Sequence, residues 1–319
     1  MTCSASLQPW SAYYRLEDIQ IPDRSRLFSI EPIGIGTWYS ESFGSYLKRI
    51  AEAHRVSVTN LLQKVLLPGS NCHIKKMHPL WRSSLHSING SSDLAEVFVN
   101  LLENATYRNL NALTLLPLES IIGRSGRGVL SKQLKICPYC LYEFSKKGAI
   151  FIPLIWWLQN VNVCPIHGTK LRCQCSFCDS NLKSISNQVP IDVCDKCGFS
   201  LAEKPTADMK GRIFDLAPGD RITCELIASL NQKTFFRNTF LSALKRLIRT
   251  KQDNDQYRNA FKPMREQQQL KQWVSGRNHP RLSDLISFSA DLNVSLFGLL
   301  SGQILPAPKK LITPCLVKQ

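Results

Sequence analysis

Residues 137–140 read CPYC, and residues 164–168 read CPIHG. Each stretch holds two potential metal ligands separated by two residues. The same spacing returns in CSFC at 175–178 and in CDKC at 194–197. Two ligands at this spacing lie on one tight turn and point at one tetrahedral ion, so two such turns supply four ligands. Four pairs within this short stretch therefore predict two closed metal sites.

The eight ligands divide most simply into two groups in the order of the chain, although the spacing leaves a cross-braced arrangement open. Zinc is the metal that such cysteine and histidine sets hold, and sites with four protein ligands are structural rather than catalytic. Two zinc ions would therefore add folding free energy to a segment rich in loops. The predicted ligands are Cys137, Cys140, Cys164 and His167 in the first site and Cys175, Cys178, Cys194 and Cys197 in the second.

The other cysteines favour metal over disulfides. The chain has 12 cysteines, and the five outside these sets are an odd number. A disulfide framework uses its cysteines evenly and forms in an oxidising compartment. The first residues, MTCSASLQPWSAYY, have no basic segment followed by an apolar one, so we expect no signal peptide and a cytoplasmic protein. Cys173, in CQCSFC, could compete with Cys175, but a C-x-C pair is a rarer turn and is left out.

The turns are expected to be of two kinds. The residue after the second ligand often has a positive φ, which glycine tolerates best. CPIHG and CDKCG place Gly168 and Gly198 there, whereas CPYC and CSFC have no glycine at that position. We therefore expect each site to combine one glycine turn with one turn of another kind.

Residues 41–66, ESFGSYLKRIAEAHRVSVTNLLQKVL, contain two helical periodicities separated by a short break. Apolar residues recur at helical spacing in 43–50 and again in 58–65. Ser57 suits the N-cap of the second segment. The pattern predicts a helix, a tight turn and a second helix, which fits a helix-turn-helix unit and an ordinary helical hairpin equally well. A further amphipathic helix is expected over 93–103, DLAEVFVNLLE.

The C-terminal third is basic. The formal net charge is +16, and residues 237–281 carry 11 Lys and Arg against three acidic residues, a net +8. Such a charge favours a polyanionic partner such as double-stranded DNA, with a solvated basic surface as the alternative. Residues 282–300 predict two helices around a turn, and VSLFGLL at 294–300 repeats the V-S-x-x-x-L-L pattern of VSVTNLL at 56–62. We therefore expect a second, DNA-binding helix-turn-helix, with an ordinary hairpin as the alternative.

Charged and polar side chains in the N-terminal unit and in the basic C-terminal third are the candidate contact residues. The DNA-binding candidates are Arg246, Arg249, Lys271, Arg277, Arg281 and Ser295. The candidates for contact with a protein partner are Arg49, Arg55 and Lys64, which we expect to be exposed. The second helix of the C-terminal unit offers few polar side chains that could read bases, so we expect DNA affinity with little sequence discrimination.

The order of these motifs resembles the TniQ/TnsD family of transposon target-selection proteins. ESFGSYLKRIA matches the opening helix of the family, with Tyr46 where tryptophan is common. CPYCL and WWLQNVNVCPIHGTKL match its first cysteine motifs, and CSFC with CDKC matches a further pair. The resemblance covers roughly residues 30 to 200, and the C-terminal region is less diagnostic.

This resemblance implies an adaptor that links target recognition to TnsC, the AAA+ regulator that recruits the transposase. Some members dock on an RNA-guided, Cascade-type CRISPR effector, and others recognise an attachment site directly. Direct site-binders usually have a longer C-terminal half, which favours the CRISPR-associated kind here, with a TnsD-like DNA-binding protein as the alternative. A free-standing zinc-ribbon transcription factor fits the basic tail but leaves the N-terminal resemblance unexplained. Whether the chain forms a homodimer stays open.

The sequence thus predicts a mainly α protein with small zinc-ribbon β elements and no membrane span. The expected parts are an N-terminal helical domain (1–130), tandem zinc ribbons (131–201), a linker (202–220) and a basic helical domain (221–319). The most apolar stretch, AIFIPLIWWL, is far shorter than the roughly 20 residues that cross a bilayer. No phosphate-binding loop, G-x-S-x-G or H-E-x-x-H motif occurs, so we expect no enzymatic activity.

Overall fold

The structure is a computed structural model that describes residues 24–68, 85–124, 128–183, 190–206, 216–232, 234–252 and 264–309. Helices dominate these residues, which confirms the prediction of a mainly α fold. Strand pairing within the described ranges is limited to isolated antiparallel bridges, among them Ile136 with Arg172 and Val193 with Ser200. The expected ribbon strands are therefore replaced by single bridges beside the cysteine turns.

The N-terminal unit contains the predicted helix, turn and helix. Helix α1 (Phe43–Ala53) is followed by a turn and by α2 (Val58–Asn60), which continues as the π-helical η3 (Leu61–Leu66). Arg55 in the turn has a φ of 54°, and the Ser57 side chain accepts a hydrogen bond from the Asn60 amide, as the N-cap prediction requires. Helix α4 (Asp93–Thr106), capped by Ser92, extends beyond the predicted 93–103. A DNA-binding role for this unit stays a prediction.

Helix α1 is the centre of the N-terminal half, because it is buried on more than one face. Its apolar stripe packs into a core with α4, while its N-terminal residues are fastened to the segment before and within η8 (Leu154–Trp157). The Ser42 amide donates to the Ile152 carbonyl at 2.9 Å, and the Ser45 hydroxyl accepts from the Ile152 amide at 3.0 Å. The apolar run that the sequence excluded as a membrane span is thus an internal layer of the fold.

Apart from α4, the described part of the segment from 85 to 146 consists of short helical turns followed by the longer helix α6. The turns are η5 (Leu85–Asn89), η6 (Asn111–Leu113), η7 (Leu116–Leu118) and α5 (Glu119–Ile122). Helix α6 (Pro138–Lys146) begins inside the CPYC motif, with Pro138 in the first turn, where its missing N–H costs no hydrogen bond.

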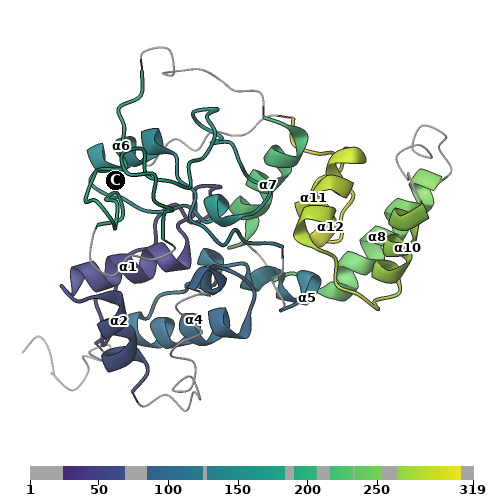
Figure 1. Cartoon of the computed structure of the whole chain (residues 1–319). Helices are drawn as coiled ribbons and strands as arrows, with labels where there is room; N and C mark the ends of the chain where they lie inside the picture. The colour runs from purple at the N-terminus through teal and green to yellow at the C-terminus, as the bar shows by residue number, and fades with distance from the viewer. Residues whose placement is uncertain are drawn as a thin grey trace, which may run out of the picture.

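Within the described ranges after residue 216, the chain forms five helices. They are α7 (Pro218–Ser229), α8 (Arg237–Gln252), α10 (Met264–Val274), α11 (Leu282–Asp291) and α12 (Leu296–Leu300). Helix α7 packs against η8, α11 and α12, and α8 packs against α10 and α12. In Figure 1, α1, α2, α4 and α6 lie at one end of the molecule, α8 and α10 at the other, and α7, α11 and α12 between them.

The C-terminal turn repeats the geometry of the N-terminal one. Asn293 has a φ of 51°, as Arg55 has 54°, and two residues later Ser295 caps α12 as Ser57 caps α2. The repeated V-S-x-x-x-L-L pattern therefore marks a repeated turn. Helix α12 has only five residues, and four of them are buried.

The described residues form two hydrophobic cores. One joins α1, η3 and α4, and the other runs from the cysteine turns through η8 to α7, α8, α11 and α12. The predicted ribbon region and C-terminal domain thus share one core. Of the predicted linker, residues 207–215 lie outside the described ranges, and α7 already begins at Pro218. No helix among the described residues is long and apolar enough to cross a membrane.

Candidate metal centres

The fold assembles the eight predicted ligands into two separate tetrads. The first tetrad is Cys137, Cys140, Cys164 and His167, and the second tetrad is Cys175, Cys178, Cys194 and Cys197. Within each tetrad the possible ligand atoms all lie within 4.8 Å of one another. The pairing is sequential, so the cross-braced alternative does not apply to this arrangement.

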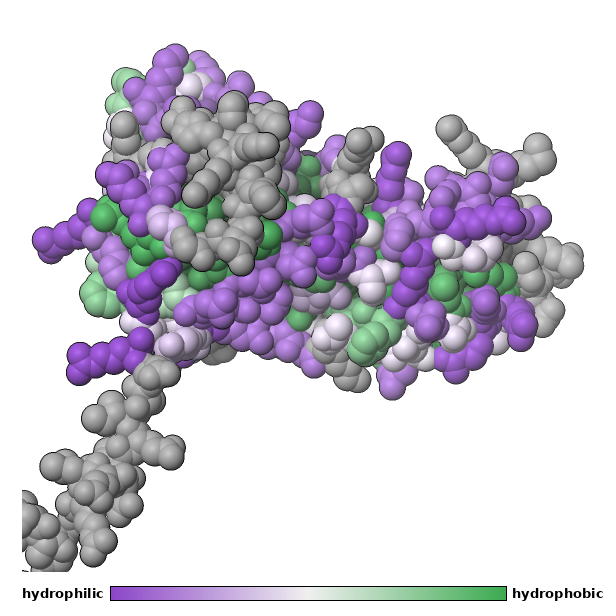
Figure 2. Space-filling model, turned by 90° about the horizontal axis from the view of Figure 1, so that it is seen from below, coloured by the Kyte–Doolittle hydropathy of each residue, from purple (hydrophilic) through white to green (hydrophobic). Residues whose placement is uncertain are grey.

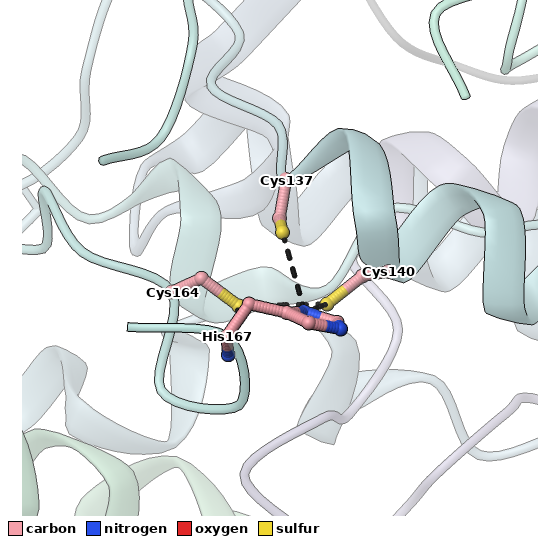
Figure 3. A group of neighbouring side chains, drawn as sticks. All are labelled: Cys137, Cys140, Cys164 and His167. Atoms are coloured by element: carbon pink, nitrogen blue, oxygen red, sulfur yellow. Dashed lines mark hydrogen bonds between the residues drawn. The ribbon is translucent and has the colours of Figure 1, made fainter. Parts of the chain in front are cut away.

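The first tetrad joins a helix start to a tight turn. Cys137 is the N-cap of α6 and Cys140 lies in its first turn, so the helix geometry itself brings both thiols to one side. Cys164 and His167 lie on a turn closed by the Gly168 amide, which donates to the Cys164 carbonyl at 2.8 Å, with Gly168 at a φ of 61°. Figure 3 shows the His167 ring pointing in among the three sulfurs.

The distances in the first tetrad fit a tetrahedral ion. His167 Nδ1 lies 3.2 Å from the sulfur of Cys140, 3.5 Å from that of Cys137 and 3.7 Å from that of Cys164. The sulfurs of Cys140 and Cys164 are 3.5 Å apart. A tetrahedral zinc with Zn–S bonds of about 2.3 Å separates its sulfurs by about 3.8 Å and each sulfur from nitrogen by about 3.6 Å. The residues present therefore fit a zinc ion.

Outer groups orient the ligands of the first tetrad. The Nε2 of His167 lies 3.3 Å from Glu143 Oε1, an arrangement in which Nε2 carries the proton and Nδ1 is left free as the ligand. The Tyr39 hydroxyl lies 3.2 Å from the sulfur of Cys140. Burial raises the pKa of the Cys140 thiol well above its ordinary value, so the thiolate needs a cation to compensate for lost hydration. This tetrad is closed and buried, as a structural site is.

The second tetrad consists of two turns of the same kind. The Asp179 amide donates to the Cys175 carbonyl at 3.0 Å, and the Gly198 amide donates to the Cys194 carbonyl at 2.9 Å. Asp179 has a φ of 54° and Gly198 a φ of 73°. The expectation of one glycine turn and one other turn was wrong here, because an aspartate tolerates the left-handed conformation that glycine usually supplies.

The second tetrad is less deeply buried than the first. Cys175 and Cys194 are buried, but Cys178 and Cys197 are accessible from outside. The sulfurs of Cys175 and Cys197, and those of Cys178 and Cys194, are each 3.8 Å apart, which matches the separation in a tetrahedral zinc–thiolate site. Both tetrads thus fit a metal, but solvent and reagents reach only the second with ease.

The predicted DNA-contact residues fall into two classes. The five basic residues are exposed along the α8–α10 end, which Figure 2 shows at its right to be largely hydrophilic. They are Arg246 and Arg249 on α8, Lys271 on α10, and Arg277 and Arg281 before α11. The expectation for Ser295 is corrected: it is 1% exposed, and its hydroxyl accepts from the Gly298 amide and donates to Glu225 at 2.8 Å.

The predicted protein-contact residues also divide. Arg55 and Lys64 are exposed, as expected. Arg49 is not a free surface group, because its guanidinium lies 2.6 Å from the carboxylate of Glu41, whose side chain is 0% exposed. The expectation that Arg49 is exposed was wrong, since its guanidinium pairs with the buried carboxyl group of Glu41. Nothing in the sequence around ESFG marks Glu41 as buried, although it lies only eight residues before Arg49.

A match to a known protein family falls on the segment that carries the sequence motifs described above. The TniQ family model matches residues 32–171, a range that includes α1, α4 and the whole first tetrad. No curated protein sequence matches the chain significantly. The match begins and ends near the limits of the segment in which ESFGSYLKRIA, CPYCL and CPIHGTKL occur. Residues 32–171 of the chain therefore form a TniQ domain, a domain that indicates a transposition-associated protein.

Proposed function

We propose that this protein is a target-selection adaptor for transposition, which links an RNA-guided, Cascade-type CRISPR effector on target DNA to the AAA+ regulator TnsC. The observation that carries the proposal is the TniQ domain over residues 32–171. The chemistry of the site agrees with an adaptor, because both tetrads have four protein ligands and leave no position for a substrate. The protein acts by binding, in the cytoplasm, without an enzymatic step of its own.

The two tetrads hold structural zinc ions in this proposal. Zinc bound there stabilises thiolates that burial alone disfavours, and it joins segments that have few hydrogen-bonded strands of their own. The first tetrad fastens α6 to the turn that follows η8. Glu143 and Tyr39 orient its ligands and are positioning residues for the ion. Zinc therefore fixes the surfaces that partners meet.

The basic α8–α10 end holds target DNA through phosphate contacts. Its exposed arginines and lysines suit a polyanion, and such contacts carry no sequence information. Base readout by α12 is disfavoured, because this helix is only five residues long and four of its residues are buried. Its N-cap, Ser295, is also buried, and its hydroxyl is already hydrogen-bonded to Glu225 and to the Gly298 amide. Sequence selection is therefore left to the effector, and the TnsD-like alternative of direct site recognition is the weaker one.

A competition experiment distinguishes the adaptor from a direct site-binder. Binding to a presumed attachment sequence is measured against scrambled duplex at physiological salt. The adaptor discriminates by about tenfold or less, and its affinity falls with salt at a log–log slope of about −0.9 per phosphate contacted. Discrimination of about a thousandfold, lost in Arg277→Ala or Arg281→Ala, would show direct site recognition. Lys64→Ala, at the opposite end, serves as the control.

A further inference from the structure

Two phenylalanines of the second tetrad stack on each other at the protein surface. The ring centroids of Phe177 and Phe199 are 4.9 Å apart, and the ring planes differ by 10°. Phe177 is 67% exposed and Phe199 is 45% exposed. Phe177 is the most exposed of the large apolar side chains in the described ranges. Two stacked aromatic rings with this exposure leave an apolar surface facing solvent.

The tetrads themselves do not require this aromatic pair, and the first tetrad serves as an internal comparison. The position of Phe177, third in CSFC, is held by Tyr139 in CPYC and by Ile166 in CPIH. Both of those side chains pack against the hydrophobic core. Phe177 and Phe199 take no part in either core. Metal binding and core packing thus leave the aromatic pair unexplained.

The backbone of the second tetrad holds the pair rigidly. The Phe177 amide lies 3.4 Å from the sulfur of Cys175, and the Phe199 carbonyl accepts from the Cys194 amide at 2.8 Å. Each ring is therefore attached next to a ligand of the same tetrad. Rings presented in a fixed arrangement lose little conformational entropy when a partner covers them, which is the property of residues that dominate binding energies.

Charge decides the class of partner. In the two turns, residues 174–183 and 190–201, three aspartates stand against two lysines, in a chain whose net charge is +16. Lys183 is also paired with Asp195, and Asp179, two residues after Phe177, is exposed. A nucleic acid would meet no excess of positive charge here, unlike at the α8–α10 end. A surface of this sign suits a protein that presents an apolar contact beside an arginine, whose guanidinium stacks on aromatic rings and pairs with carboxylates.

We propose that the stacked Phe177–Phe199 pair, with Asp179 beside it, is the docking surface for a protein partner that presents arginine next to an apolar contact. This inference rests on the proposed adaptor function, which gives the protein two partners, an RNA-containing effector and the AAA+ regulator TnsC. Because the surface has no excess of positive charge for RNA, we assign it to TnsC. The second tetrad lies at the α1 end, since Gly44 and Lys48 share a cavity wall with Cys194. TnsC would therefore bind at the α1 end of the molecule and target DNA at the basic α8–α10 end, which lies opposite to it (Figure 1).

The test measures the affinity of purified TnsC for the full chain and its variants. Phe177→Ser with Phe199→Ser removes the aromatic surface and is expected to weaken binding by about 30-fold or more, as loss of central aromatic anchors does. Asp179→Asn keeps a residue that tolerates the left-handed turn and is expected to weaken binding by about threefold, less at high salt. The matched control is Phe236→Ser, which removes a phenylalanine of 64% exposure at the other end and leaves affinity unchanged.

Metal content and melting temperature of each variant are measured alongside. Loss of TnsC binding with full metal content and unchanged affinity for duplex DNA supports the docking surface. TnsC binding within twofold of wild type, an equal loss in Phe236→Ser, or a loss confined to DNA binding overturns it. If the double variant loses metal, Asp179→Asn decides instead, and an unchanged affinity in that variant overturns the proposal. A wild-type chain that does not bind TnsC overturns the adaptor function itself, together with this occupant.

Discussion

Arg49 and Glu41 form a buried pair whose removal has a cost that depends on pH. Glu41 is 0% exposed and accepts hydrogen bonds from the Ile33 amide, the Ser45 hydroxyl and Arg49. Burial raises the pKa of Glu41 from 4.5 to about 7, against the attraction of Arg49. The folded state therefore holds a proton that the unfolded state releases, so stability falls as pH rises from 4.5 to about 7, by about 3 kcal/mol in total.

Arg49→Met removes the only cation shown beside Glu41 in the described residues, and raises the pKa of the carboxyl further. At pH 6 the carboxyl is protonated in both proteins, and the variant loses about 1 kcal/mol for the hydrogen bonds of Arg49 to Glu41 and to the exposed Glu31 carbonyl. Above pH 7 the stability of the wild type levels off, because Glu41 is then ionised in the folded and the unfolded state. The carboxyl of the variant stays protonated in the folded state, so the stability of the variant keeps falling, and the difference grows by about 1.4 kcal/mol per pH unit. At pH 9 the variant is therefore less stable by about 4 kcal/mol, in the range expected for a broken buried pair.

The assay is urea unfolding at pH 6, 7.5 and 9 with the wild type, Arg49→Met and the double variant Glu41→Gln, Arg49→Met. The double variant is expected to lose the extra pH dependence, because no ionisable group remains at the site. Lys64→Met is the surface control and stays within about 0.5 kcal/mol at every pH. A loss of stability in Arg49→Met that is equal at pH 6 and pH 9, or below about 0.5 kcal/mol at both, would show that Arg49 does not control the ionisation of Glu41.

Three further outcomes follow from the tetrads and from a buried lysine. Elemental analysis of the purified chain is expected to find two zinc ions per molecule, unchanged in Cys173→Ser, and one ion or none contradicts the two-site assignment. A chelator is expected to remove one ion well before the other, because the second tetrad is open to solvent and the first is closed, and simultaneous release would show that burial does not control exchange. Lys135→Met is expected to cost about 2–4 kcal/mol in urea unfolding, because Lys135 is only 8% exposed and its ammonium donates to the Leu158 and Val161 carbonyls, which would lose their partner. A loss of stability below about 1 kcal/mol would mean that water replaces the Lys135 ammonium as the hydrogen-bond donor to these carbonyls.

The tetrads could be predicted from the sequence because ligand spacing within a turn is a local property. Cys-x-x-Cys fixes both donors by the geometry of four residues, and sequential order then brings neighbouring turns together. The form of each turn was harder to predict. Asp179 takes the left-handed conformation assigned to glycine alone, and Cys137 and Cys140 use a helix start rather than a turn. The conformation of Asp179 and the helix start at Cys137 both depend on residues other than the ligands, so ligand spacing alone cannot predict them.

Burial was the property that sequence patterns predicted least well. Arg49 lies on an amphipathic helix and looked exposed, but a second layer from residues 149–158 covers the start of α1 and leaves Glu41 inside. Ser295 looked like a reader of DNA, but α7 lies against its helix and Glu225 occupies its hydroxyl. The burial at the start of α1 and the burial of Ser295 both depend on contacts between segments about 70 to 115 residues apart in sequence. Hydrophobic periodicity cannot detect such contacts. Glu143, by contrast, lies three residues after Cys140, so a search for carboxylates near ligands could have found it.

The most direct test of the adaptor function is the recruitment of TnsC to target DNA. Labelled TnsC is added to duplex carrying the bound effector, with and without this chain, and its retention on the duplex is measured. An adaptor function predicts that TnsC is retained on effector-bound DNA only when the chain is present, and that duplex without effector retains TnsC at about one-tenth of that level or less. Equal retention of TnsC without the chain, or its retention on an attachment sequence in the absence of any effector, would rule out the effector-dependent adaptor function.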